Sequence, residues 1–324
     1  MQNLIRIINM VEIVNLLSVQ RIILTVSFLL LSSVTDAENI PADTLEGSIN
    51  ACNAGGASDC SFLGYIYSSG EGVQQDNTKA TNFYNKACDA GDMGSCSSLA
   101  SSYYLGKEVE QDYVKAAGLF LSSCKGGDLS GCSILGNMYF NGEGLEKNHK
   151  IAAELYAKAC NGGEVVGCRK LANLHYDGEG VERDYQVAAG LYAKACNGGN
   201  MSGCSLLGVM YYSGEGVKQD YRKAALLYDK ACTGGNMGGC FSLAVSYSNG
   251  EGLQQNYKKA VELYAKACSV GDIGSCLNLG NSYSNGEGVA QDKSRAKALY
   301  VQVCNSGNQQ GCNNQQILEE QGVR

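Results

Sequence analysis

Apolar residues recur along this chain with the spacing of amphipathic helices, as the segment 201–236 illustrates. Two stripes in this segment occupy positions i, i+3, i+4 and i+7. The first stripe consists of Cys204, Leu207, Gly208 and Tyr211. The second stripe consists of Ala224, Leu227, Tyr228 and Ala231. Each stripe places small and large apolar side chains on one helical face. The segment therefore predicts two helices, an A helix followed by a B helix.

Glycines and capping residues bound the two helices. Gly214 follows the A helix and suits a left-handed C-cap, and Gly216 allows a second tight turn. Asp220 precedes the B helix as an N-cap, and Gly234 and Gly235 follow that helix. Each predicted helix has about 12 residues, which is too short to be stable alone. The helices must therefore bury their faces against each other and against neighbouring units.

Cysteines show that this two-helix unit repeats. Pairs of cysteines spaced eight residues apart recur every 36 residues, and the register never slips. Such a fixed period is typical of stacked supersecondary units. The seven full units are 57–92, 93–128, 129–164, 165–200, 201–236, 237–272 and 273–308. An N-terminal half-repeat over 38–56 and a capping helix over 309–324 flank them. We therefore expect an all-α fold, an α/α solenoid that forms one elongated domain.

The repeat resembles the Sel1-like repeat family, a relative of the tetratricopeptide repeat. The matching text is Leu-Gly-x-x-Tyr-x-x-Gly-x-Gly-Val over 207–217 and Asp-Tyr-x-Lys-Ala over 220–224. The Ala-Cys-x-x-Gly-(Asp/Asn)-x-x-x-Cys text is similar to the Helicobacter cysteine-rich protein subgroup. The resemblance implies helix–turn–helix repeats in a right-handed superhelix. The chain departs from the pattern at Glu108, which replaces the second turn glycine, and at Glu164-Val165.

Composition and charge narrow the possible functions. The formal net charge of −7 argues against a basic surface that tracks nucleic-acid phosphates. His149 and His175 are the two histidines of the chain, so a metal site built on several histidines is excluded. We therefore expect no nucleic-acid partner and no metal or other cofactor.

The residues before the first repeat predict export. An apolar run of about 13 residues follows Arg21, and Thr35-Asp36-Ala37 offers small residues for a cleavage site. The run is shorter than a membrane span. We therefore predict a signal peptide over 1–37, a true start at Met1 or Met10, and a secreted or periplasmic chain without a membrane span after cleavage. The long apolar segment before Arg21 leaves a retained anchor as the alternative.

Export would place the sixteen cysteines in an oxidising compartment, where an even count indicates disulfides. The turn between a B helix and the next A helix is short, so the two thiols of a pair can face each other. Zinc is the alternative, but its ligands usually stand two to four residues apart and often include histidine. We predict the disulfides Cys52–Cys60, Cys88–Cys96, Cys124–Cys132, Cys160–Cys168, Cys196–Cys204, Cys232–Cys240, Cys268–Cys276 and Cys304–Cys312.

The family resemblance also implies slow β-lactam hydrolysis or penicillin binding. Serine β-lactamases pair a nucleophilic Ser with a Lys three residues on, together with Ser-Asp-Asn and Lys-Thr-Gly elements. This chain has two Ser-x-x-Lys strings, from Ser122 and from Ser294, about as many as chance yields, and it lacks both other elements. The catalytic residues therefore remain unknown, and the enzyme activity rests on the resemblance alone.

A binding surface is predicted on the A helices. Arg169 and Asn173 stand four residues apart, hence on one helical face, and Asn137 and Asn281 share the register of Asn173. His175 takes the place of a repeated tyrosine. Arg can hold a carboxylate, and Asn can bond peptide groups as donor and acceptor. The alternative is that these residues have no binding role: Arg169 and the asparagines would then belong to a solvated helix face, and His175 would be a packing residue.

Three functions remain open from the sequence. The first is an exported scaffold that binds peptides, cell-wall fragments or proteins through a concave A-helix surface. The second is a slow β-lactamase or penicillin-binding protein, as the resemblance implies. The third is a secreted factor that acts on host cells.

Overall fold

The computed structural model describes residues 42–107 and 109–323, and these residues form sixteen α-helices. The predicted signal peptide, the choice between Met1 and Met10, and Glu108 lie outside the described residues. The chain divides into two compact units, residues 1–122 and 123–324, and the boundary falls within α6. The first unit contains α2 (Ala42–Asn53), α3 (Ala57–Ser69), α4 (Asn77–Asp89), α5 (Met93–Leu105) and most of α6 (Tyr113–Lys125).

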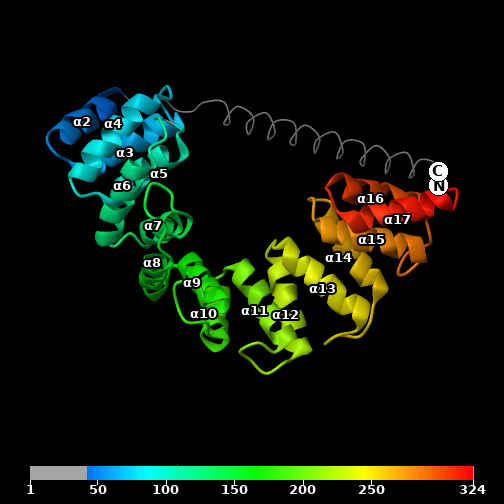
Figure 1. Ribbon diagram of the computed structural model, residues 1–324. Helices are drawn as coiled ribbons and strands as arrows, with labels where there is room; N and C mark the ends of the chain where they lie inside the picture. Colours follow the sequence, from blue (N-terminus) through cyan, green and yellow to red (C-terminus); the bar gives the residue numbers. More distant parts are fainter. Residues whose placement is uncertain (1–41, 108, 324) are drawn as a thin grey trace, which may run out of the picture. The chain divides into compact units, whose positions relative to one another are not determined.

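The second unit contains the remaining helices, which alternate between A and B helices as Figure 1 shows. Its A helices are α7 (Leu129–Asn141), α9 (Val165–Asp177), α11 (Met201–Ser213), α13 (Met237–Asn249), α15 (Ile273–Asn285) and α17 (Gln309–Glu320). Its B helices are α8 (His149–Asn161), α10 (Tyr185–Asn197), α12 (Tyr221–Thr233), α14 (Tyr257–Cys268) and α16 (Lys293–Asn305). The predicted all-α solenoid of paired helices is therefore confirmed.

Small residues on the A helix let its B helix approach closely. A Cβ atom on Gly136 of α7 would lie 2.6 Å from the ring of Tyr156 on α8. Leu135 and Tyr156 are both buried at this contact. Ala172 stands at the corresponding position of α9 and is also buried, so the contact tolerates one methyl group. The apolar stripes predicted from the sequence are therefore the faces that pack within each repeat.

The turn between an A helix and its B helix contains two glycines with positive φ. Gly214 ends α11 at φ 82°, and Gly216 follows at φ 68°. A Cβ atom on Gly216 would collide with the carbonyl oxygen of Tyr185, the first residue of α10 in the preceding repeat. The second glycine therefore lets each turn rest on the repeat before it.

Each of the eight predicted cysteine pairs forms a disulfide, and the Cα atoms of a pair lie 4.4–4.7 Å apart. Every bridge joins the end of a B helix to the next A helix. The intervening turn ends in an N-cap such as Asn200, whose side chain accepts a hydrogen bond from the Gly203 amide. Glu164 serves α9 in the same way, accepting from the amides of Val166 and Gly167. Although Glu164 is longer than the Asp or Asn found at the other turns, it caps α9 in the same way, so the turn before α9 is preserved.

Polar contacts also join neighbouring repeats of the second unit. Lys194 Nζ donates to the carbonyl oxygen of Cys160 at 2.8 Å, and Lys158 and Lys230 make the same contact one repeat away on either side. The phenol of Tyr176 donates to Glu215 in the next turn at 2.7 Å, and Tyr212 donates to Glu251 at 2.9 Å.

One junction differs from its neighbours. Phe140 occupies the register of Tyr176 and has no hydroxyl group. Its ring stacks on His149, with centroids 4.6 Å apart, and Glu179 lies 3.9 Å from His149 Nδ1. Stacking therefore replaces the Tyr–Glu hydrogen bond at the junction of α8 with the turn after α9.

Replacing Cys196 and Cys204 together by Ser should weaken the junction between α10 and α11. A closed loop of about nine residues contributes about 2.5 kcal/mol in the chain-entropy model. We expect a loss of that order in urea unfolding, with amide exchange rising first around this junction. The matched Cys304→Ser, Cys312→Ser variant should raise exchange only at α16 and α17. Unchanged unfolding and exchange in both variants would show that the bridges carry no stability.

Tyr176 should make the fold sensitive to alkaline pH. Its hydrogen bond to Glu215, helped by burial, raises the pKa of Tyr176 from 10.0 to about 12. Since the folded state disfavours ionisation, the stabilisation is complete below about pH 10 and declines as the pH rises towards 12. The Tyr176→Phe variant should therefore lose less stability than the parent chain between about pH 10 and 12 in urea unfolding. Identical losses would contradict this assignment.

Candidate functional site

A row of buried tyrosines runs through the second unit, one from each B helix. The row consists of Tyr156, Tyr192, Tyr228, Tyr264 and Tyr300. Burial raises the pKa of each of these phenols, so all of them stay protonated at neutral pH.

Asparagines of the A helices accept hydrogen bonds from three of these phenols. Asn137 Oδ1 accepts from Tyr156 at 2.8 Å, and Asn173 Oδ1 accepts from Tyr192 at 2.8 Å. Among the described residues, the Nδ2 groups of Asn137 and Asn173 have no hydrogen-bond partner. Each of these amide oxygens therefore already holds a phenol, and the use of the asparagines as donor and acceptor towards a peptide stays a prediction.

Each phenol is also contacted by the A helix of the following repeat. Its contributing residue stands two positions after the A-helix cysteine, as Ser242 does beside Tyr228 and Asn278 does beside Tyr264. Each pair of neighbouring A helices thus flanks a buried phenol. We call this face of α7, α9, α11, α13, α15 and α17 the A-helix surface.

Arg169 lies beside the first two phenols of this surface. Its positive charge acts on both Tyr156 and Tyr192, opposing the effect of burial on their pKa values. Lys170 follows it on α9, and burial together with the neighbouring Arg169 lowers the pKa of Lys170. Neither side chain makes a hydrogen bond or ion pair with any residue in 42–107 or 109–323, although both are half-buried. Two cations without a partner among the described residues therefore stand on α9, whose acidic residue Asp177 also acts on Tyr192.

The structure brings three predicted residues together and separates two others. Asn137, Arg169 and Asn173 gather around Tyr156 and Tyr192. His175 instead contacts the turn after α9, where its Nδ1 lies 3.2 Å from the Glu182 carbonyl oxygen.

Asn281 lies four repeats away from Asn137, in a separate groove of about 380 Å³. Tyr300 donates to its Oδ1 at 2.7 Å, and Asn314 of α17 donates to the same oxygen at 3.3 Å. The predicted set is therefore one cluster and two outlying residues.

Sequence reasoning did not find Lys170 or the part played by the tyrosines. The apolar stripe predicts these tyrosines as packing residues, which their burial supports, but the hydroxyl groups of Tyr156, Tyr192 and Tyr300 also bond asparagines. The adjacent Arg169-Lys170 pair was a usable signal, because α7, α11, α13 and α15 contain neither Arg nor Lys.

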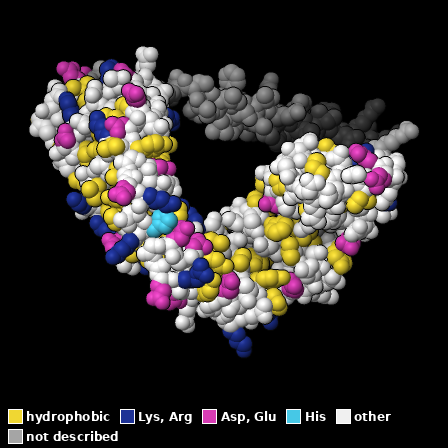
Figure 2. Space-filling view, viewed as in Figure 1, with side chains coloured by type: hydrophobic (Ala, Val, Ile, Leu, Met, Phe, Trp, Pro, Cys, Tyr) yellow, Lys and Arg dark blue, Asp and Glu magenta, His cyan; other side chains and the backbone are white. Residues whose placement is uncertain are grey.

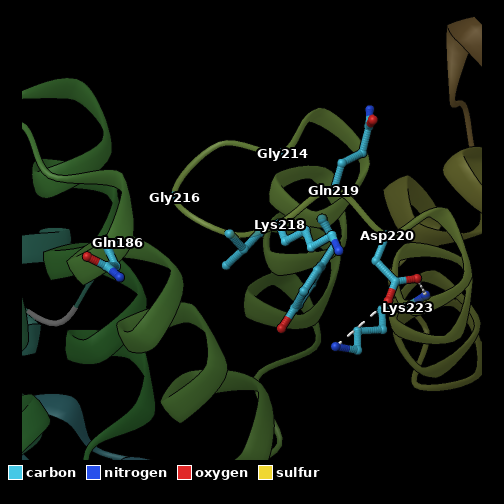
Figure 3. Close-up of a pocket in the computed structure, with 9 residues that line it drawn as sticks. Gln186, Gly214, Gly216, Lys218, Gln219, Asp220 and Lys223 are labelled. Atoms are coloured by element: carbon cyan, nitrogen blue, oxygen red, sulfur yellow. Dashed lines mark hydrogen bonds and ion pairs between the residues drawn. The ribbon is translucent and has the colours of Figure 1, made fainter.

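A larger groove of about 840 Å³ lies elsewhere, between the turn 214–220 and the start of α10 (Figure 3). Gln186 faces the turn across this groove. Two of its charged residues pair with each other, because Lys223 Nζ lies 3.7 Å from Asp220, and the same Nζ lies 5.2 Å from the Tyr211 ring centre. The groove gathers none of the predicted site residues, and Lys218, which also lines it, has no hydrogen-bond or ion-pair partner among the described residues.

The Ser-x-x-Lys strings do not form catalytic pairs in the structure. Ser122 is exposed and donates to the Gly118 carbonyl oxygen of its own helix. Ser294 is also exposed, and Lys297 bonds the Val323 carbonyl oxygen at 3.0 Å and Glu319 at 3.4 Å.

Residues 42–107 and 109–323 contain no cluster of His, Cys, Asp and Glu that could hold a metal ion. None of their helices is both long and apolar enough to cross a membrane.

Solved structures similar to this chain share its fold. An antigen described as protective, present in uropathogenic Escherichia coli strains and displaying an SLR fold, is 28% identical with a TM-score of 0.77. The match covers 82% of this chain, which spans 57% of that protein. A Sel1 repeat protein from Oxalobacter formigenes is 22% identical with a TM-score of 0.72, covering 86% and 82% of the two chains.

Helicobacter pylori cysteine-rich protein B is 30% identical over 41% of this chain and 96% of its own, with a TM-score of 0.35. No curated protein matches the chain. The Sel1 repeat family matches residues 57–92, 95–128, 130–164, 165–200, 202–236, 239–272 and 273–308. Those seven matches follow the cysteine period through both units, and the chain belongs to the Sel1 repeat family.

Proposed function

We propose that this Sel1 repeat scaffold binds an extended peptide or protein segment across α7, α9 and α11. The observation that carries the proposal is Arg169, a half-buried guanidinium group without an acidic partner among the described residues. A half-buried charge is costly unless a counter-charge reaches it. A carboxylate supplied by a ligand would fit the planar fork of the Arg169 side chain.

The asparagines extend this site along the array. Asn137 and Asn173 share a register on neighbouring A helices, about 10 Å apart at normal helix packing distances. An extended chain crosses that distance in about three residues at about 3.3 Å each. Since the phenols occupy both Oδ1 atoms, the Nδ2 groups would donate to peptide carbonyl oxygens. The pattern thus fits the carbonyl groups of a main chain together with one anionic group.

The disulfides support an oxidising, extracytoplasmic location, and we propose that the chain is periplasmic or secreted. A relative described as a protective antigen supports exposure outside the cytoplasm. Ligands of the proposed chemistry there include protein segments and the peptide parts of cell-wall fragments. The spacing of the cysteines also favours the cysteine-rich subgroup typified by the Helicobacter pylori protein. No contact among the described residues favours β-lactam hydrolysis.

Replacing Arg169 by Ala should weaken binding of an acidic peptide at least tenfold. A hydrogen bond to a charged group contributes about 1.5–3 kcal/mol, and the guanidinium group is the proposed partner of the carboxylate. The measurement is fluorescence anisotropy with a labelled peptide that has one free carboxylate, at two salt concentrations.

The matched control is Arg222→Ala, which removes one positive charge from an exposed position of α12. This variant should bind like the parent chain, because Arg222 lies on a B helix outside the A-helix surface. Normal binding by the Arg169→Ala, Asn173→Ala double variant would place the site elsewhere. Equal weakening of binding by Arg169→Ala and Arg222→Ala would show that the affinity depends only on the net charge of the protein.

A further inference from the structure

The A-helix surface changes its chemistry from one repeat to the next. Asn137 and Asn173 share their register with Val209 on α11 and Val245 on α13. The register of Arg169 is occupied on α13 by Phe241, whose ring lies 6.1 Å from that of Tyr264. The asparagine register is therefore apolar on both α11 and α13, whereas the Arg169 register holds Ser205 on α11 and becomes apolar on α13.

These apolar side chains are only partly covered. Val209 remains 39% exposed, and Val245 and Phe241 are partly buried against the core. On the face shown in Figure 2, hydrophobic side chains gather over α11 to α14, whereas charged side chains of both signs gather over α8 to α10. A solvated helix face would carry polar residues at such positions. The valines therefore form an apolar stretch that continues directly from the proposed peptide site.

The positive charges of the A-helix surface lie on α9. Arg169 and Lys170 are the two Lys or Arg residues on α7, α9, α11, α13 and α15. The acidic residue on the same helices is Asp177, about 12 Å along α9 from Arg169 at the rise of an α-helix. Both cations therefore favour an anionic group at the α9 end and none at the α11–α13 end.

From this arrangement we infer the order of chemical groups in the ligand, an inference that rests on the proposed function. The bound segment carries a carboxylate at Arg169 and Lys170, followed by apolar side chains that reach Val209 and then Val245 with Phe241. At about 10 Å per repeat and about 3.3 Å per extended residue, the apolar side chains stand about three and six residues from the carboxylate. The partner is an extended acidic segment with this apolar spacing.

Peptides of equal composition test the spacing. The probes are labelled, end-blocked heptapeptides: Asp-Ser-Gly-Val-Ser-Gly-Val, its reverse, and the scrambled Asp-Val-Val-Ser-Gly-Ser-Gly. A fourth probe replaces both valines by Ser. With the full-length chain, we expect one of the two spaced peptides to bind at least fivefold more tightly than the scrambled and valine-free peptides. Equal affinity for all four probes would overturn the inference and leave the proposed function standing, provided that Arg169→Ala still weakens binding.

Two valines of matched exposure provide the protein-side test. Val209 is 39% exposed on α11, and Val187 is 40% exposed on the B helix α10. The Val209→Ser variant should bind the preferred spaced peptide at least threefold more weakly, whereas Val187→Ser should bind it normally. Neither change should affect the affinity for the valine-free peptide.

Two outcomes contradict the inference. The first is equal behaviour of Val209→Ser and Val187→Ser. The second is a dimer, detected by sedimentation, that Val209→Ser dissociates without changing peptide affinity, since a second copy would then cover the apolar stretch. Loss of binding for every probe, with no effect of Arg169→Ala, would instead contradict the proposed function itself.

Discussion

The contact between each B helix and the A helix that follows it holds this structure together. Helices of 12 or 13 residues are too short to persist by themselves, so each must be buried against neighbours on both sides. At this contact the disulfide fixes the chain, and Gly167 and Gly203 let α9 and α11 lie against Ala159 and Ala195 of the preceding B helices. A Lys from the following B helix then bonds the last carbonyl groups. Stability is thus distributed along the array, junction by junction.

The same junctions make the surface. Because every A helix is held against its own B helix and the preceding one, its outward positions recur at each repeat in a fixed register. A change at one register position therefore alters one repeat and leaves its neighbours in place. Arg169 and Lys170 differ from their register mates in this way, and so do Val209 and Val245. The scaffold allows local chemistry to vary while the spacing between chemical groups stays constant.

Most of the fold could be predicted from the sequence, because the period is strict and each residue type at a turn has one physical reason. Gly214, Gly216 and Asp220 adopt the roles that their positions indicate. The grouping of Asn137, Arg169 and Asn173 could also be predicted from helical spacing. The phenol that bonds each asparagine could not be predicted in this way, because it belongs to another helix, and the spacing of residues along one helix does not show which residues of another helix they contact. The contact of His175 with the Glu182 carbonyl oxygen in the following turn could not be predicted from helical spacing either.

Through its hydrogen bond to Asn173, the buried phenol of Tyr192 affects the chemistry of the A-helix surface. The phenol holds the oxygen end of the amide, so a buried hydroxyl group fixes the orientation of a half-buried polar group of the A-helix surface. Losing that hydroxyl would free the amide to turn over and accept as readily as it donates. A repeat protein of this kind can therefore change its specificity by substitutions in its core, and comparing the exposed residues of two relatives would not reveal the difference.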